Sequence, residues 1–236
     1  MIAGGRWTKD FGTSPYLAEA IAFARVDKPL VVQIGAANGD DRAFGFAMVK
    51  LLQKAGAGEV LWPRVCGRKS DPEAMREALA KAQVIFVNGG DVEEGMKVLT
   101  DLELVADVRR AAARGAACVG ISAGAIMLGE RWIAWPNAKA TDDEAATFEC
   151  LGIAKVSIDT HGEKHKWAEM RSFVAVRARE TGRTATGYGV PSGAALLCDA
   201  SGATSALGAP VQAFQAKKSE PVESLKDLPV AGTPNA

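Results

Sequence analysis

Short apolar runs alternate with stretches of helical periodicity through the first half of the chain. Residues 84–87 (VIFV) and 117–120 (ACVG) are apolar throughout and have the length of strands buried on both faces. Each is followed by a glycine-containing turn and then by a stretch with helical spacing. The predicted elements are strands at 30–34, 59–65, 84–87 and 117–120, helices at 43–55, 71–82, 92–99 and 104–114, and a helix start after residue 122.

Doubly buried strands that alternate with helices are typical of a parallel sheet with helices on both faces. We therefore predict an α/β fold with a single domain over residues 1–216. The segment 217–236 is rich in Pro, Lys, Glu and Ser, and we expect a polar tail that is disordered or laid along the surface. The second half predicts strands at 156–159 and 209–214, a helix at 167–179, and a closing hairpin made by 188–190 and 194–199.

The charge balance and the missing motifs exclude several classes of function. Lys+Arg and Asp+Glu number 28 each, so no net charge attracts nucleic acid or an anionic membrane. No apolar run approaches the roughly 20 residues of a membrane span, and the N-terminus lacks the pattern of a signal peptide. We therefore expect a cytoplasmic protein. Neither glycine-rich nucleotide-binding motif occurs, so no cofactor is predicted.

The strongest chemical signal is the G-x-S-x-G motif at 120–124, between a predicted strand and a predicted helix. In this arrangement a tight turn exposes the central side chain, here Ser122, and the flanking glycines avoid a steric clash. The backbone N–H of Ala123 would then face a developing oxyanion at a helix N-terminus. The alternative is a glycine-rich turn that only connects two elements. We favour a nucleophilic Ser122.

A second turn, at 88–91 (NGGD), also follows a buried strand at the edge where open α/β sheets bind ligands. Its glycines would let the N–H of Gly90 approach a substrate oxygen and act as a second oxyanion donor. In the plainer interpretation, Asp91 only caps the next helix. The two roles are compatible because they use different atoms.

Serine hydrolysis commonly needs a histidine base, and the chain has two histidines. His161 follows the predicted strand 156–159, whereas His165 lies in a lysine-rich stretch and is expected to be solvated. The spacing matches neither H-E-x-x-H nor H-x-x-E-H, and Gly162 disfavours a regular helix here. We therefore predict His161 as the base and no metal site.

Trp132 and Trp135 follow the predicted helix after Ser122. Packing in the core or in a loop is the ordinary explanation for both. The functional alternative is a hydrophobic wall over the active site.

Taken in order, these motifs resemble those of the dipeptidase E and cyanophycinase family of serine peptidases. The resemblance extends from about residue 30 to residue 214, and its most specific piece is Gly-Ile-Ser-Ala-Gly-Ala at 120–125. The turn 88–91, the Asp-x-His at 159–161 and the Gly-x-Gly-Val at 187–190 follow in the family's order.

The resemblance implies a fold similar to that of class I glutamine amidotransferases and a homodimer. It implies that Ser122 is the nucleophile, that His161 is the base, and that the N–H groups of Gly90 and Ala123 form the oxyanion hole. The residues that it assigns to substrate binding are Asp91, Asp159 and Thr160.

One departure concerns the group that orients the base. The family has a glutamate after its Gly-x-Gly stretch, and here Ser192 occupies that place. A hydroxyl can hold an imidazole tautomer but adds no negative charge. Either Ser192 completes a weaker catalytic set, or the site has lost catalysis, or another carboxylate takes over. The carboxylates considered for this role are Asp142, Asp143, Glu149 and Asp159.

The favoured function is therefore a cytosolic serine peptidase, an exopeptidase or dipeptidase that cleaves short peptides. A preference for an N-terminal Asp would need a cation in the pocket, for which Lys164, Lys166 and Arg171 are candidates. Two alternatives remain open. The chain could be an inactive relative that binds a peptide or metabolite, or it could be an esterase or amidase.

Overall fold

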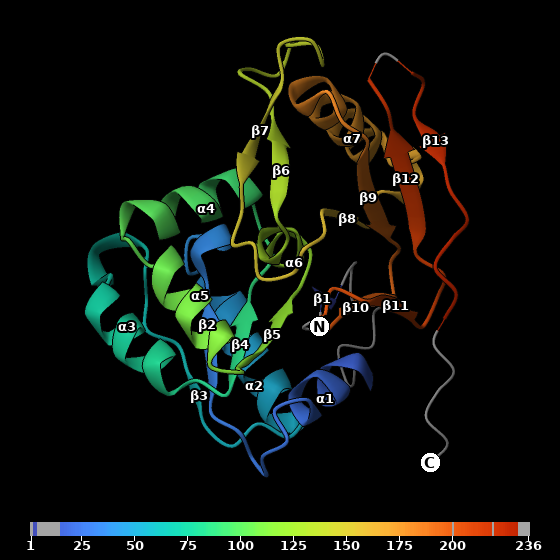
Figure 1. Cartoon of the computed structure of the whole chain (residues 1–236). Helices are drawn as coiled ribbons and strands as arrows, with labels where there is room; N and C mark the ends of the chain where they lie inside the picture. Colours follow the sequence, from blue (N-terminus) through green and yellow to red (C-terminus); the bar gives the residue numbers. More distant parts are fainter. Residues whose placement is uncertain (1, 4–14, 200, 219, 231–236) are drawn as a thin grey trace.

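The core of the molecule is a parallel sheet of four strands in the order β3-β2-β4-β5 (Figure 1). The computed structural model describes residues 2–3, 15–199, 201–218 and 220–230. All three strand pairings are parallel, so all four carboxyl ends lie at one edge of the sheet. The strands are β2 (Val31–Ile34), β3 (Val60–Leu61), β4 (Val84–Val87) and β5 (Ala117–Gly120).

Helices cover both faces of this sheet, as the sequence predicted. Side chains alternate along the strands, so Val84 and Phe86 pack on one face with α1 and α2, whereas Ile85 and Val87 pack on the other with α3 and α5. Side chains of Asp41, Asp71 and Asp91 cap helices. The helices of this half are α1 (Pro15–Ala22), α2 (Arg42–Lys54), α3 (Pro72–Lys81), α4 (Val92–Asp101), α5 (Val105–Ala113) and α6 (Ala123–Leu128), with 3-10 turns η1 (Ala36–Asn38) and η2 (Gly67–Lys69).

A second sheet, in the order β13-β12-β9-β8, packs against helix α7 (Figure 1). Its one parallel pairing joins β8 to β9. Helix α6 lies between the two sheets and contacts both β5 and β8, which brings the ends of these two strands together. The elements are β8 (Ile158–Thr160), η3 (Glu163–His165), α7 (Ala168–Thr181), β9 (Ala185–Val190), β12 (Gln212–Ala216) and β13 (Glu223–Ser224).

The expected hairpin between 188–190 and 194–199 is wrong. β9 pairs with β8 and β12, whereas β10 (Ala195–Cys198) pairs with β1 (Ile2–Ala3) and β11 (Thr204–Leu207) in another sheet. The turn between them is closed by a hydrogen bond from Ala194 N–H to the carbonyl oxygen of Pro191, and the chain then enters a different sheet. The two segments were expected to pair because they are close in sequence, but each pairs instead with strands that are more distant along the chain.

Two further segments differ from the expectation. Only Val60–Leu61 of the predicted strand 59–65 is paired as a strand. A hairpin of β6 (Arg131–Ala134) and β7 (Ala146–Glu149) was not foreseen, because its strands are short and carry polar residues. The described part of the tail lies along the surface, where β13 pairs with β12 at the edge of the second sheet, and residues 219 and 231–236 lie outside the described residues. No helix in the described chain is long and apolar enough to cross a membrane.

Two glycines of β9 allow α7 to approach the second sheet closely. A Cβ at Gly187 would lie 2.3 Å from Sδ of Met170, and one at Gly189 would lie 2.6 Å from the ring of Trp167. Trp167 is buried and also touches the loop after β8, because a Cβ at Gly162 would lie 2.8 Å from its ring. The Gly-x-Gly of the sequence motif therefore serves the packing of α7.

We predict that Gly189→Ala lowers the free energy of unfolding by about 1–3 kcal/mol, because the added methyl group overpacks the rigid ring of Trp167. Urea unfolding of the variant measures this change. Thr186→Ala, at an exposed position of the same strand, is the control and is expected to change stability by less than about 0.5 kcal/mol. Equal effects of the two substitutions would contradict this packing role.

Candidate active site

Ser122 lies in the sharp turn between β5 and α6. Its backbone dihedrals are φ 52° and ψ −126°, a conformation that L-residues rarely adopt and that costs about 1–3 kcal/mol. A Cβ at Gly120 would lie 2.4 Å from the carbonyl oxygen of Gly124, and one at Gly124 would lie 2.1 Å from the carbonyl oxygen of Val87. Both motif glycines are thus required by close backbone contacts, and the turn is a nucleophile elbow.

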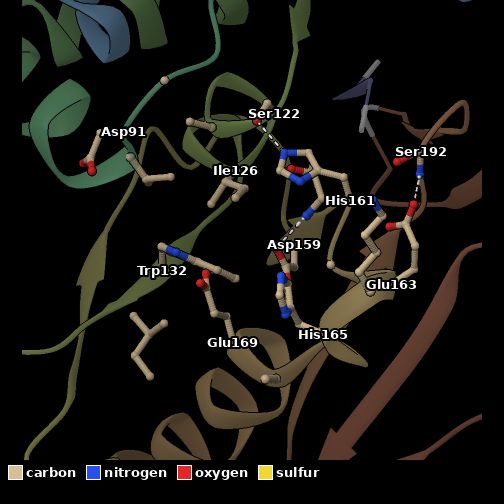
Figure 2. Close-up of a pocket in the computed structure, with 18 of the residues that line it drawn as sticks. Asp91, Ser122, Ile126, Trp132, Asp159, His161, Glu163, His165, Glu169 and Ser192 are labelled. Atoms are coloured by element: carbon tan, nitrogen blue, oxygen red, sulfur yellow. Dashed lines mark hydrogen bonds between the residues drawn. The ribbon is translucent and has the colours of Figure 1, made fainter. Parts of the chain in front are cut away.

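His161 stands at the carboxyl end of β8, and its imidazole meets the elbow (Figure 2). The distance from Ser122 Oγ to His161 Nε2 is 2.8 Å. The backbone N–H of His161 donates to the carbonyl oxygen of Val190 at 3.0 Å, and its φ of 46° is also positive. The two side chains come from different sheets, so the packing of α6 between β5 and β8 is what brings them together.

Two backbone N–H groups beside Ser122 lack an acceptor within the described chain. They belong to Gly90, after β4, and to Ala123, the first residue of α6. Gly90 has φ 150°, and a Cβ there would lie 1.9 Å from the carbonyl oxygen of Ala37. Both residues line the same cavity as Ser122 and His161. Free N–H groups at this place are the donors that an oxyanion needs.

The cavity has a volume of about 770 Å³ and is lined by all the residues that the sequence assigned to catalysis, the oxyanion hole or substrate binding, but not by Asp142, Asp143 or Glu149, the other carboxylates proposed to orient the base. Asp91 lines it while its Oδ1 accepts from the N–H of Glu94 at 2.9 Å, so this side chain also caps α4. Asp159 and Thr160 line it from β8. Of the three cations considered for Asp recognition, Lys164 lines the cavity.

Ser192 contacts Glu163 rather than the histidine. Its backbone N–H donates to Glu163 Oε1 at 3.1 Å (Figure 2). Within the described chain, Ser192 makes no hydrogen bond to His161, and no residue there hydrogen-bonds to Nδ1 of His161. Burial tends to raise the pKa of Glu163, but hydrogen bonds from Ser192 and attraction to His161 outweigh it and lower the pKa, so this carboxylate stays ionised.

Asp159 is the one deeply buried carboxyl group among the described lining residues, with 6 % of its surface exposed. Burial, the largest cause, and the charges of Glu169 and Glu163 together raise its pKa to about 7. The N–H groups of Thr160 and Met170 oppose this shift, and the Thr160 N–H donates to Oδ1 at 2.7 Å. Asp159 therefore changes its protonation state near neutral pH.

Trp132 forms an apolar wall of the cavity, as one of the two interpretations of this residue suggested. It comes from β6, is 5 % exposed and stacks on Phe173 of α7, with ring centroids 5.6 Å apart. Trp135 instead donates from Nε1 to Asp142 at 3.1 Å and is not among the lining residues.

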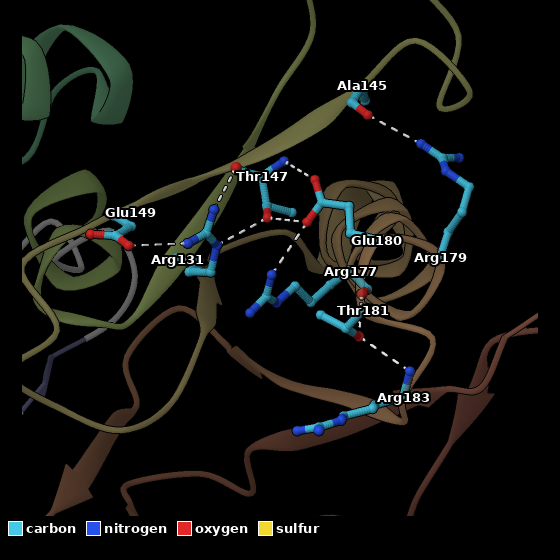
Figure 3. A network of polar contacts seen from close by, with 9 residues as sticks. All are labelled: Arg131, Ala145, Thr147, Glu149, Arg177, Arg179, Glu180, Thr181 and Arg183. Carbon is cyan, nitrogen blue, oxygen red and sulfur yellow. Dashed lines mark hydrogen bonds and ion pairs between the residues drawn. The ribbon is translucent and has the colours of Figure 1, made fainter.

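A polar network holds the β6–β7 hairpin on α7 (Figure 3). Glu180 of α7 accepts from the N–H and the Oγ1–H of Thr147, at 2.7 and 2.5 Å. Arg131 donates to the carbonyl oxygen of Thr147 at 2.7 Å and to its Oγ1 at 3.0 Å. Because Trp132 is the neighbour of Arg131, this network fixes the apolar wall relative to α7.

Several lining residues escaped the sequence analysis. Glu163 lies two positions after the predicted base, and this short spacing is the feature of the sequence from which its place in the site could have been predicted. Helix α7 was predicted, but its register did not show that Glu169 points into the cavity. His165 was expected to be solvated, and it is exposed while lining the same cavity. The remaining lining residues that were not foreseen are Val92, Glu93, Ile126, Ile133, Gly162 and Ala168.

The α/β fold, the elbow and the Ser122–His161 contact together define a serine hydrolase. The model of peptidase family S51 matches residues 2–206, so the chain belongs to this family and is a serine-type peptidase.

Two solved structures are similar in fold. A peptidase from an acI-B1 actinobacterium has 19 % identity and a TM-score of 0.65, over 98 % of this chain and 93 % of the other. A Listeria monocytogenes EGD-e protein, named provisionally as a peptidase E, has 16 % identity and a TM-score of 0.55, over 97 % of both chains. A search among curated proteins found no match.

The strain at Ser122 predicts an inverted stability order. Ser122→Gly should unfold at a free energy about 1 kcal/mol higher than Ser122→Ala, because only glycine relaxes at this positive φ. At an ordinary helical position the order is the reverse. Thermal and urea unfolding of the two variants measure the difference, and a more stable alanine variant would show that the elbow is not strained.

The raised pKa of Asp159 predicts that the free energy of unfolding depends on pH. The folded state keeps the proton up to about pH 7 and the unfolded state loses it near pH 3.8, so stability falls as the pH rises between these values. Asp159→Asn removes this loss. Between pH 4 and pH 8, the free energy of unfolding of the variant should increase relative to that of the wild type by at most about 4 kcal/mol.

Urea unfolding across this pH range tests the prediction. Asp27→Asn, at an exposed position where the side chain makes no hydrogen bond or ion pair to another described residue, is the control and should follow the wild type. A difference between Asp159→Asn and wild type that does not vary with pH would contradict the assigned protonation.

Proposed function

We propose that this peptidase hydrolyses short peptides by acyl transfer through Ser122, with His161 as the general base and acid. The observation that carries the proposal is the 2.8 Å contact between Ser122 Oγ and His161 Nε2 at the wall of a cavity. The cavity of about 770 Å³ suits a few amino-acid residues. We extend the proposal to exopeptidase or dipeptidase action, because the order of the motifs resembles that of the dipeptidase E family.

In the first half-reaction, Ser122 Oγ attacks the scissile carbonyl carbon while His161 Nε2 accepts the hydroxyl proton. The carbonyl oxygen becomes an oxyanion, which the N–H groups of Gly90 and Ala123 stabilise. When the C–N bond breaks, His161 returns the proton to the leaving amine. Water then attacks the acyl-enzyme ester with His161 again as base, which releases the acid and restores Ser122.

The imidazole must carry its proton on Nδ1 for Nε2 to accept from Ser122. Neither Ser192 nor Glu163 hydrogen-bonds to Nδ1. The attraction to His161 that helps to lower the pKa of Glu163 acts equally on the imidazolium formed in the reaction. We therefore assign Glu163, held by Ser192, to electrostatic stabilisation of that cation from a distance.

Digestion of a mixed library of short peptides, followed by mass spectrometry, tests the proposal. We expect the wild type to trim peptides and Ser122→Ala to lose at least about 10³-fold in rate. Ser201→Ala, at an exposed serine outside the cavity, is the control and should cut like the wild type. The positions of the cuts identify the peptide end that is processed.

Cleavage that persists in Ser122→Ala would contradict the proposed nucleophile, and the absence of any cleavage by the wild type would contradict the proposed substrates. The homodimer implied by the sequence resemblance and the cytoplasmic location expected from the sequence stay predictions.

A further inference from the structure

The lining of the active-site cavity is strongly acidic. Its described residues contribute five carboxyl groups and one permanently cationic side chain, that of Lys164. The carboxyl groups come from α4 and its cap, from β8, from η3 and from α7, so they surround the space rather than form one local run. They belong to Asp91, Glu93, Asp159, Glu163 and Glu169.

No lysine or arginine within the described chain forms an ion pair with any of these five groups; the ion pairs found there join other residues. Arg171, a candidate for neutralising them, is held elsewhere, with its guanidinium 4.9 Å from the ring centre of Phe214 and a 2.9 Å hydrogen bond to Ser224. Lys166 is not among the lining residues. The negative potential in the cavity is therefore largely uncompensated, and it favours a cationic ligand.

Three of the five carboxylates already have donors. Asp91, Asp159 and Glu163 each accept a backbone N–H. Glu169 has no hydrogen-bond partner in the described chain, although it stands in the first turn of a helix that is packed in place. Its carboxylate is thus available to a ligand.

Glu169 shares the lining of the cavity with a fixed aromatic ring, that of Trp132. In Figure 2 its carboxylate points toward Trp132, on the side of the cavity away from Ser192. The stacking of Trp132 on Phe173 and the network of Figure 3 hold this ring in place. A carboxylate and an aromatic ring that line the same cavity favour an ammonium or guanidinium group, and the apolar lining accepts the methylene stem of the same side chain.

We propose that Glu169 and Trp132 form a subsite for a basic side chain, lysine or arginine, of the short peptide that is cleaved. This inference rests on the proposed peptidase function and names its substrate class. The proposed preference for a basic residue is the opposite of the preference for an acidic residue that a cationic pocket would give.

The test compares kcat/KM for matched peptides that differ in one residue: lysine, the neutral norleucine, or glutamate. Each is made with a free and with an acetylated N-terminus, which separates the side-chain charge from the α-amino charge. We expect the wild type to prefer lysine over norleucine by about tenfold or more, as one charge-assisted contact allows. The glutamate peptide should be the poorest.

The variants assign this preference to the subsite. In Glu169→Gln the ratio between lysine and norleucine peptides should fall to within about threefold, and in Glu169→Lys the glutamate peptide should become better than the lysine peptide. Glu77→Gln is the matched control. This glutamate is also exposed on a helix, lies outside the cavity and makes no hydrogen bond or ion pair to another described residue, so the ratio should stay that of the wild type.

A wild type that cuts lysine and norleucine peptides equally, prefers glutamate, or responds only to acetylation would overturn the proposal. A ratio that is unchanged in Glu169→Gln would overturn the role of this residue. All these outcomes leave Ser122-dependent cleavage, and thus the proposed function, standing.

Binding keeps the proposal testable if no peptide is cleaved. Calorimetry with Ser122→Ala should show tighter binding of the lysine peptide than of the norleucine peptide, with the difference lost in the Ser122→Ala, Glu169→Gln double variant. Equal affinities of the two peptides for Ser122→Ala would contradict the subsite independently of any chemistry.

Discussion

The strained backbone of Ser122 is the constraint on which the rest of the site depends. Its positive φ arises because Ser122 lies in the short turn between the end of β5, at the carboxyl edge of the sheet, and the start of α6. Gly120 and Gly124 allow this sharp turn, since a Cβ at either position would clash with a neighbouring carbonyl oxygen. Helix α6 then packs between two sheets and carries the elbow to the end of β8, where His161 stands. The same short helix exposes the N–H of Ala123 beside the serine. One local conformation therefore brings together Ser122, His161 and the N–H of Ala123, the proposed nucleophile, base and oxyanion donor.

Electrostatics sets the character of the cavity around this elbow. Ser192 and His161 lower the pKa of Glu163 and keep it ionised, whereas burial raises the pKa of Asp159 to about 7. In a chain with zero net charge, the concentration of carboxylates in one cavity is a local feature that composition conceals. In the proposed mechanism, the carboxylates around His161 therefore also bear on the choice of peptide.

Local patterns were sufficient for the elements of the first sheet and for the residues at its edge. The G-x-S-x-G and NGGD turns carry their own steric requirements, and those requirements recur in the structure at Gly120, Gly124 and Gly90. The pairing of β9 with β12 and the contact of Ser192 with Glu163 depend on residues far apart in the chain, which no local pattern encodes. Glu169 was missed for the same reason, because its position relative to Trp132 follows from the docking of the β6–β7 hairpin on α7.

The most direct test of the central claim is to find which atom a serine-directed phosphonate modifies. Peptide mapping of the labelled wild type should locate a single adduct on Oγ of Ser122. Labelling of His161→Ala should be slower by at least about 10²-fold, because the hydroxyl then lacks its base. An adduct on another residue, or equally fast labelling without His161, would contradict the account of an elbow serine activated by this histidine.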